Sequence, residues 1–211
     1  IFKLTQVHIT CFFKSNDTLS LWCAISCISK IHRIFLEKVN GFYQGAAFPF
    51  LKGFGSGNIV ARFAADGSMF TGGTNRGWGS HGRKPFSFQR VNWTGKVPFE
   101  VHEMRVRPDG FELTFTHAAD TKTLTDTASY SMEAYTYIYQ ASYGSPVVDK
   151  STPSLTKAIP GKDGKSVRLT VTGLVKGNVH ELKMPGIRAK EGDLPLLHNV
   201  AYYTLNEIPS K

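Results

Sequence analysis

Residues 72–82 read Gly-Gly-Thr-Asn-Arg-Gly-Trp-Gly-Ser-His-Gly, and five of these eleven residues are glycine. Glycine loses more backbone freedom on folding than any other residue, so the cluster indicates left-handed backbone angles or a close approach of another segment. Alternating apolar and polar residues precede this stretch at 59–70 and come after it at 86–93, which predicts strands on both sides. The stretch is therefore expected to be a loop in an all-β fold, and no helix pattern comes after it as a dinucleotide-binding motif requires.

The same loop is a candidate binding site, because it offers side chains that form hydrogen bonds, carry charge or stack. These side chains are Asn75, Arg76, Trp78 and His81. A second interpretation is structural: Trp78 would fill a core and Arg76 would donate to loop carbonyls. Glycine-rich loops occur in both settings, so the sequence leaves both interpretations open.

The basic charge of the chain is concentrated around this loop. The 211 residues carry a formal net charge of +9, and residues 31–95 hold eight Lys and Arg against Glu37 and Asp66, which gives +6. A basic surface attracts nucleic acid, acidic polysaccharide or an acidic protein surface. No basic helix, zinc-ligand spacing or aromatic RNA-binding signature is present, so nucleic acid is not an expected partner. Carbohydrate, an acidic glycan in particular, remains a candidate partner.

Residues 1–30 differ in composition from the rest and contain all three cysteines, Cys11, Cys23 and Cys27. Their spacing matches no common metal or haem motif, so we assign them no chemistry. The apolar run from Leu19 to Ser29 is too short to span a bilayer, and no membrane span is expected. Three interpretations stay open: a signal-like segment, a buried pair of strands, or a segment that is not native to the rest of the chain.

Residues 31–95 are predicted to form short strands separated by turns. Asn40-Gly41 ends one strand, and Asp66-Gly67 lies at the turn of a hairpin that runs from Asn58 to Thr71. Short strands with glycine-rich loops at this spacing are typical of a β-propeller blade. We therefore predict that residues 31–95 are the terminal blade remnant of a propeller.

Residues 96–211 are predicted to form an immunoglobulin-like β-sandwich. Phe111, Leu113 and Phe115 alternate with polar residues and should share one buried face. A parity shift at His102-Glu103 predicts a β-bulge. About seven short strands over some 110 residues match the immunoglobulin-like architecture. The boundary between the two parts is expected near Gly95.

A row of tyrosines is the second candidate binding site. The predicted strand 131–140 places Tyr135, Tyr137 and Tyr139 on one face, about 7 Å apart at ~3.3 Å per residue. Flat rings at this spacing stack on sugars, but they also cover the second face of a sandwich. No nucleophile motif or converging acid–base pair is present, and Asp120 and Asp126 suit helix capping better than calcium binding. We assign no catalytic and no metal-binding residue.

The chain also resembles a known group of proteins, through two blocks of sequence. They are Tyr43-Gln44-Gly45, Phe48-Pro49-Phe50, Asp66-Gly67-Ser68 and Thr74-Asn75-Arg76-Gly77-Trp78-Gly79, followed by Gly110-Phe111-Glu112-Leu113-Thr114-Phe115-Thr116, Asp120, Ala128-Ser129-Tyr130, Tyr143-Gly144-Ser145, Leu197-His198 and Ala201-Tyr202-Tyr203-Thr204-Leu205-Asn206. These blocks are similar to the C-terminal part of large secreted bacterial proteins of planctomycete type. Those proteins contain a propeller similar to glucose/sorbosone dehydrogenases, often fused to cytochrome c modules. The resemblance covers about residues 31–209.

The resemblance implies a secreted or periplasmic protein with a propeller of a type whose enzyme chemistry is sugar oxidation with a quinone. Pyrroloquinoline quinone (PQQ) and calcium are candidate cofactors of the full-length parent, and the resemblance leaves open whether that parent is an active dehydrogenase. It implies that the remaining propeller blades and a cytochrome c domain are partners. This chain has no Cys-x-x-Cys-His motif for haem, and we expect no cofactor in it. We expect a non-catalytic portion with a structural or carbohydrate-interaction role. The alternative is that the chain completes the active-site propeller of a quinone-dependent sugar dehydrogenase.

Overall fold

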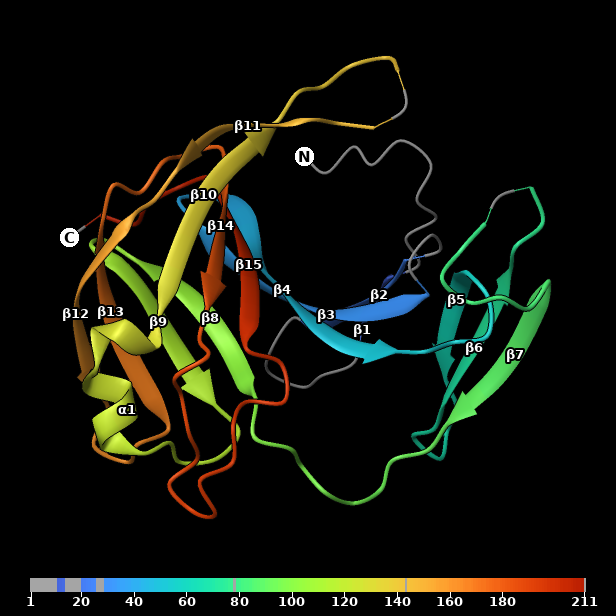
Figure 1. The fold of residues 1–211 in the computed structure, drawn as a ribbon, viewed down its shortest axis with the longest axis horizontal. Helices are drawn as coiled ribbons and strands as arrows, with labels where there is room; N and C mark the ends of the chain where they lie inside the picture. The colour runs from blue at the N-terminus through green and yellow to red at the C-terminus, as the bar shows by residue number, and fades with distance from the viewer. Residues whose placement is uncertain (1–10, 14–19, 26–28, 78, 143, 211) are drawn as a thin grey trace. The chain divides into compact units, whose positions relative to one another are not determined.

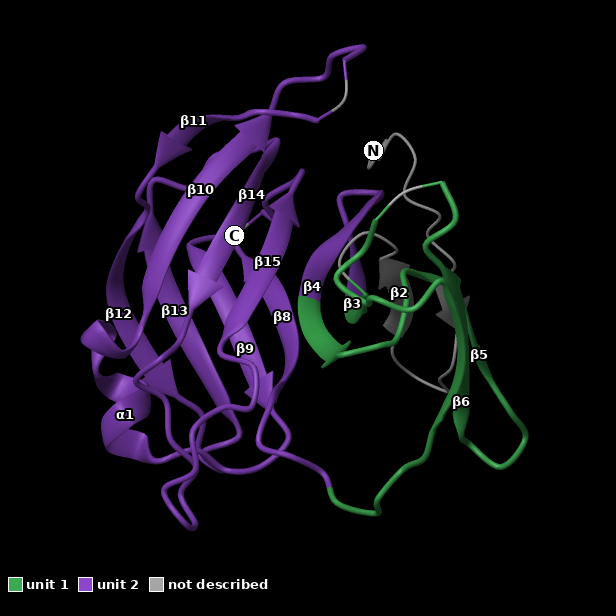
Figure 2. Cartoon of the chain, turned by 45° about the vertical axis from the view of Figure 1, so that its right-hand side comes forward, with its two compact units in different colours: residues 1–34, 48–96 green, residues 35–47, 97–211 purple. Residues whose placement is uncertain are grey.

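The structure is a computed structural model that describes residues 11–13, 20–25, 29–77, 79–142 and 144–210, with side chains from Ser29 onward. These residues form three antiparallel sheets and little helix, which confirms the all-β class (Figure 1). Among them, no helix has the length and apolar character needed to cross a bilayer. The chain divides into unit 1, residues 1–34 and 48–96, and unit 2, residues 35–47 and 97–211 (Figure 2).

Unit 1 contains a three-stranded sheet in the order β5-β6-β7. Its strands are β5 (Asn58–Phe63), β6 (Met69–Thr74) and β7 (Phe86–Val91), and the short strands β1 (Cys11–Phe13) and β2 (Ser20–Ile25) also belong to this unit. The expected Asp-Gly turn joins β5 to β6: Gly67 has φ +82°, and Asp66 Oδ1 accepts from the Ser68 amide at 2.9 Å. One face of the sheet packs on a small core with Ile31, Phe54, Ala61 and Met69.

A long hairpin, β3 (Lys30–Val39) and β4 (Phe42–Lys52), contributes residues 35–47 to unit 2. Its turn is the expected Asn40-Gly41, and both residues have positive φ, +49° and +88°. Such a two-residue turn matches the twist of paired strands. Gly45 is required by close approach, because a Cβ there would lie 1.9 Å from the carbonyl oxygen of Phe35.

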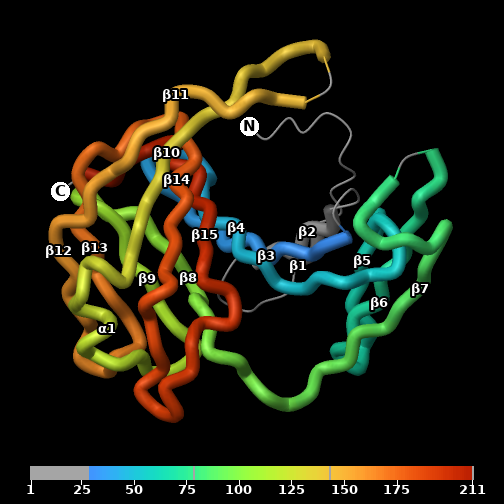
Figure 3. The backbone as a smooth tube through the Cα atoms, in the orientation of Figure 1, coloured from blue at the N-terminus to red at the C-terminus, as the bar shows by residue number. Residues whose placement is uncertain are grey.

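Unit 2 consists of two antiparallel sheets packed face to face. The first continues from β4 in the order β4-β15-β14-β10-β11, and the second has the order β12-β13-β9-β8 (Figure 3). The elements from residue 97 onward are β8 (Val101–Arg107), β9 (Gly110–Phe115), α1 (Thr121–Thr125), a 3-10 turn (Thr127–Ser129), β10 (Ser131–Tyr137), β11 (Val147–Ser151), β12 (Ser154–Pro160), β13 (Ser166–Thr172), β14 (Asn178–Lys183) and β15 (Val200–Leu205).

The core of unit 2 lies between these sheets. The fully buried Phe111 ring of β9 lies 5.1 Å from the Tyr203 ring of β15 and 5.8 Å from the His180 ring of β14. The alternation predicted from the sequence is confirmed, because all of its apolar residues are buried: Phe111, Leu113, Phe115, Val167, Leu169 and Val171. The predicted bulge is present as a register shift between Val101 and Glu103.

A largely buried polar network joins residues 35–47 of the β3–β4 hairpin to the sandwich of unit 2. Glu37 Oε1 accepts from the Tyr203 hydroxyl at 2.6 Å and from the Val106 amide at 2.7 Å. Gln44 Nε2 donates to the same hydroxyl at 2.9 Å, and its Oε1 accepts from the amides of Asn206 and Glu207. The Glu37 side chain is only 9% exposed, so its hydrogen bonds are shielded from water.

Replacing Glu37 tests this network. Glu37→Ala removes the acceptor of one hydroxyl and one amide, and we expect it to lower the free energy of unfolding by about 2 kcal/mol. Denaturant unfolding of the full chain measures the change. Glu112→Ala is the matched control, because it removes a carboxylate that pairs with Arg107 at the surface and should cost less than about 1 kcal/mol. Equal losses for the two variants would contradict a structural role for the network.

Candidate functional site

The glycine-rich loop between β6 and β7 is held in place by Asn75. Its Oδ1 accepts from the Gly57 amide at 3.0 Å and from the Ser80 hydroxyl at 2.6 Å. Its Nδ2 donates to the carbonyls of Gly82 and Lys84. Asn75 thus performs the carbonyl-bonding role that the structural interpretation had given to Arg76.

Two glycines of the stretch 72–82 are required by close backbone approach: Gly73, which lies in strand β6 and not in the loop that the sequence predicted, and Gly82 in the loop itself. A Cβ at Gly73 would lie 2.2 Å from the Gly57 carbonyl oxygen, and a Cβ at Gly82 would lie 2.5 Å from the Phe54 carbonyl oxygen. Gly82 is further fixed by its amide, which donates to the Ser29 hydroxyl at 2.9 Å. Because the ends of the loop are fixed in this way, its exposed side chains stand on a defined backbone.

Arg76 and His81 are exposed on this loop. The Arg76 guanidinium makes no hydrogen bond or ion pair with another described residue, while its backbone amide donates to the Thr74 hydroxyl at 3.0 Å. Trp78 lies outside the described residues. The arrangement leaves the Arg76 charge available to a ligand as far as the described part of the chain is concerned.

Two phenylalanines beside the loop are exposed to an unusual degree: Phe86 is 75% and Phe88 is 77% exposed. The pairing of β6 with β7 places Phe86 opposite Thr74, Phe88 opposite Gly72 and Arg90 opposite Phe70, so these residues share one face. Gly72 has no side chain, and the Phe88 ring stacks on the Phe70 ring with centroids 5.5 Å apart. The Arg90 guanidinium lies 5.5 Å from the Phe70 ring.

We call this surface the phenylalanine face: Phe70, Phe86, Phe88 and Arg90. The adjoining loop carries the exposed cations Arg76, Arg83 and Lys84. The sequence alternation at 86–93 had predicted the strand but not that its aromatic side would be exposed. The signal that could have shown it is the opposing glycine, Gly72, which leaves the aromatic rings of the neighbouring strand without a covering side chain.

The charge around this face is strongly positive. Residues 29–34 and 48–96 of unit 1 hold nine Lys and Arg against a single acid, Asp66, which gives a net +8. Asp66 is paired with Arg90, and hydrogen bonds from Ser68 lower its pKa, so it stays ionised. The side chains of Arg76, Arg83 and Lys84 make no hydrogen bond or ion pair within the described residues. The flat apolar rings of the face therefore adjoin a loop with available cations.

The predicted tyrosine row is only partly formed in unit 2. Strand β10 ends at Tyr137, and Tyr139 lies beyond it with 74% of its surface exposed. Tyr135 is buried at 8% exposure, and its ring meets the half-exposed Tyr137 ring edge-on at 5.6 Å. The structure adds Tyr202 from β15 to this group, a neighbour that a pattern within one strand cannot show.

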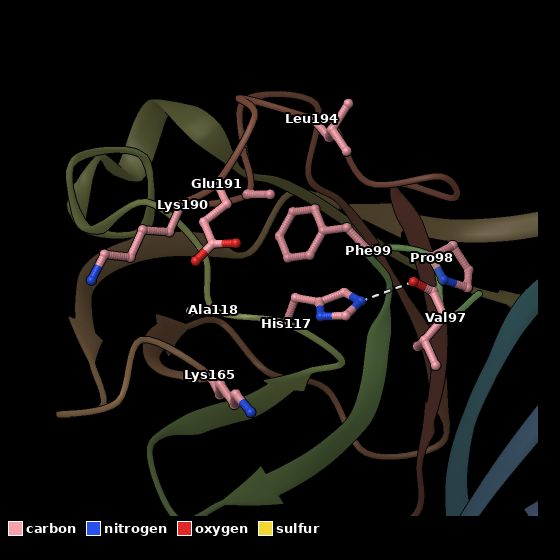
Figure 4. A pocket seen from close by; sticks show the side chains of 10 residues that line it. Val97, Pro98, Phe99, His117, Ala118, Lys165, Lys190, Glu191 and Leu194 are labelled. Atoms are coloured by element: carbon pink, nitrogen blue, oxygen red, sulfur yellow. Dashed lines mark hydrogen bonds between the residues drawn. The ribbon is translucent and has the colours of Figure 1, made fainter. Parts of the chain in front are cut away.

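Unit 2 also has a cavity of about 440 Å³ (Figure 4). Phe99 and Leu194 form part of its mainly apolar wall, and His117 Nε2 lies 2.9 Å from the Val97 carbonyl oxygen at one side. Lys165, Lys190 and Glu191 line it as well. None of the described residues that line the cavity is a serine, threonine or cysteine.

Several other titratable groups of unit 2 have structural partners. His198 Nδ1 lies 2.6 Å from Glu100 Oε1, so the histidine–carboxylate pair in space differs from the sequence neighbours His102 and Glu103. Asp120 caps α1 and Asp126 caps the 3-10 turn, as the capping interpretation expected. Within the described part of the chain, no three His, Cys, Asp or Glu side chains come together as a metal site.

Comparison of the chain with family models, curated proteins and solved structures found no match.

Proposed function

We propose that this chain is a non-catalytic portion of a secreted protein similar to glucose/sorbosone dehydrogenases, and that its phenylalanine face binds acidic glycans. The observation that carries the binding proposal is that two exposed phenylalanine rings adjoin a loop whose cations Arg76, Arg83 and Lys84 have no side-chain partner within the described residues. Uronate or sulfate groups would meet Arg76, Arg83 and Lys84. Sugar rings would stack on Phe86 and Phe88.

The strand order of unit 2 supports an immunoglobulin-like sandwich as the second part of this protein. The order β8-β9-β13-β12 corresponds to strands A-B-E-D of that fold, and β15-β14-β10 corresponds to G-F-C. Strand β11 takes the place beside C that an additional strand occupies in variable-type domains. Domains of this architecture serve many binding and structural roles, so the topology supports the fold class and indicates no particular function.

Residues 31–95 are proposed to be the end of a propeller, as their resemblance implies. The support for this is the three-stranded antiparallel sheet β5-β6-β7. The remaining blades, and a cytochrome c domain where one is fused, would be their partners in the full-length protein.

Two interactions would contribute to acidic-glycan binding, charge attraction and ring stacking, and they respond differently to salt. The net +8 of residues 29–34 and 48–96 attracts polyanions, and this attraction weakens as salt shortens the screening length from ~30 Å at 0.01 M to ~10 Å at 0.1 M. Stacking on Phe86 and Phe88 depends little on salt. Binding should therefore be tight at low salt, should weaken as salt rises, and should need the rings at every salt concentration.

The test uses the full chain and polygalacturonate in affinity electrophoresis at low salt. Phe88→Ala should weaken binding about tenfold, since one stacked ring contributes on the order of 1 kcal/mol. Arg76→Ala should weaken it by a smaller factor that shrinks as salt rises. Neither variant should change the melting temperature of unit 2.

Lys157→Ala is the matched control, because Lys157 is an exposed cation of β12 in unit 2. It removes the same charge as Arg76→Ala and should leave the affinity nearly unchanged. The proposal is wrong if the unaltered chain shows no retardation by polygalacturonate at low salt. It is also wrong if Lys157→Ala weakens binding as much as Arg76→Ala, because non-specific charge would then explain the effect.

A further inference from the structure

The outward face of β10, β14 and β15 in unit 2 carries a second group of aromatic and charged side chains. Antiparallel pairing places Glu133 opposite Glu181, and Glu181 opposite Tyr202, so these three residues form one row across the sheet. Tyr135 lies two residues from Glu133 and therefore faces the same side. The opposite side of these strands faces the core, where His180 and Tyr203 meet Phe111.

The rings of this group are held in fixed orientations. Tyr135 and Tyr137 meet at an interplanar angle of 87°, and the buried Tyr135 supports its 48% exposed neighbour. Tyr202, on strand β15, is half-buried. A supported ring loses little conformational entropy when a ligand stacks on it, which favours Tyr137 as a stacking platform.

Hydrogen-bonding groups of both kinds lie beside the rings. Glu181 Oε2 accepts from the Tyr135 hydroxyl at 3.1 Å, and Glu181 Oε1 lies 3.3 Å from Lys183 Nζ. Lys183 Nζ also lies 3.5 Å from Glu133 Oε1. Carboxylate acceptors and an ammonium donor side by side can pair with adjacent hydroxyls of a sugar, which donate and accept at once.

The local charge distinguishes this face from the phenylalanine face. Two carboxylates, Glu133 and Glu181, stand against one ammonium, Lys183, so the group is slightly negative and disfavours acidic sugars. Burial, followed by the charge of Glu181, raises the pKa of the Tyr202 phenol, which keeps it a neutral donor. The hydrogen bond with Glu181 raises the pKa of Lys183, so the ammonium stays charged.

We infer that this tyrosine face, formed by Tyr135, Tyr137, Tyr202, Glu181 and Lys183, binds an uncharged sugar unit of a polysaccharide. The sugar ring stacks on Tyr137, and its hydroxyls pair with Glu181 and Lys183. The site lies wholly within unit 2 and uses no residue of the phenylalanine face. The chain would thus carry two carbohydrate sites with opposite charge preference, one for acidic and one for uncharged sugars.

The test is affinity electrophoresis of the full chain in gels that contain one uncharged polysaccharide each: laminarin, dextran, xylan or hydroxyethylcellulose. We expect at least one of them to retard the chain at a salt concentration that abolishes binding to polygalacturonate. Tyr137→Ala should weaken this retardation by at least about tenfold. Tyr137→Phe should retain most of it, because the ring remains. Glu181→Gln should weaken it while preserving the ring contacts.

Tyr139→Ala is the matched control, since Tyr139 is also a tyrosine, is more exposed than Tyr137 and does not belong to the tyrosine face. It should change the retardation less than about twofold. The inference is overturned if none of the four polysaccharides retards the unaltered chain, or if Tyr139→Ala matches Tyr137→Ala. Failure of polygalacturonate binding alone would sink the proposed function of unit 1 and leave this inference standing.

Discussion

Phe111→Ala should destabilise unit 2 by about 3–5 kcal/mol, among the largest effects of any single truncation in the chain. Phe111 is fully buried, and its ring contacts the Tyr203 and His180 rings of the opposite sheet. Truncation removes the transfer free energy of the ring and leaves a cavity between two sheets whose backbones are fixed by their hydrogen bonds. The surrounding residues can therefore collapse only partly into the space.

Thermal unfolding of the full chain measures this loss, which should lower the melting temperature of unit 2 by roughly 10 °C. Ile159→Ala is the control, because Ile159 is 44% exposed on β12 and truncation there leaves no cavity. The melting temperature of unit 2 in this variant should fall by no more than about 2 °C. A shift for Phe111→Ala no larger than that of the control would mean that the two sheets do not pack through this ring.

Acid should destabilise unit 2 through His180. The side chain is fully buried, and loss of hydration lowers its pKa from the ordinary 6.5 to about 4. Above pH 6.5 the histidine is neutral in both the folded and the unfolded chain. Between pH 6.5 and 4 the unfolded chain takes up a proton that the folded chain does not, so stability falls as pH falls. The full shift corresponds to about 3 kcal/mol.

Denaturant unfolding at a series of pH values from 7 to 4 checks this dependence. His180→Gln removes the titrating group while keeping a side chain that accepts hydrogen bonds, as Nε2 does from the Val175 amide at 3.3 Å. The variant should be less stable at pH 7 but should lose much less of its remaining stability on acidification. If the free energy of unfolding falls equally with pH in the variant and the unaltered chain, groups other than His180 cause the acid sensitivity.

The parts of the fold that depend on local pattern were predictable from the sequence. The alternation from Phe111 to Phe115 gave a correct buried face, because strand side chains alternate with a period of two. The Asn40-Gly41 and Asp66-Gly67 turns were correct, because left-handed backbone angles favour these residues. The bulge near Glu103 was predictable, because the alternation of apolar and polar residues shifts by one position there.

Features that join distant residues were not predictable in this way. Residues 35–47 group with unit 2 because Glu37 and Gln44 bond to Tyr203, about 160 positions later in the chain. No local pattern records such a partner. Tyr202 and Glu181 join Tyr135 and Tyr137 only through the pairing of three strands. The exposure of Phe86 and Phe88 was likewise not predictable, because it depends on whether a segment distant in sequence packs on that face.

The candidate loop shows how similar residue types divide their roles. Asn75 and Arg76 are neighbours, and both carry several donors in their side chains. The short Asn75 amide reaches three loop groups and the Gly57 amide and fixes the backbone. The longer Arg76 side chain extends from the exposed part of the loop. The sequence identified both as candidates, and only the geometry separates the structural residue from the one that stays a candidate for binding.

Binding of acidic glycans at the phenylalanine face is tested most directly by hydrogen exchange of the full chain with and without polygalacturonate at low salt. Strand β7 is at the edge of its sheet, so a ligand on it and on the adjacent loop should slow exchange there. The account predicts added protection for the amides of residues 74–91 and no change for residues 166–172 of β13. Protection that is absent from residues 74–91, or equal in β13, would contradict it.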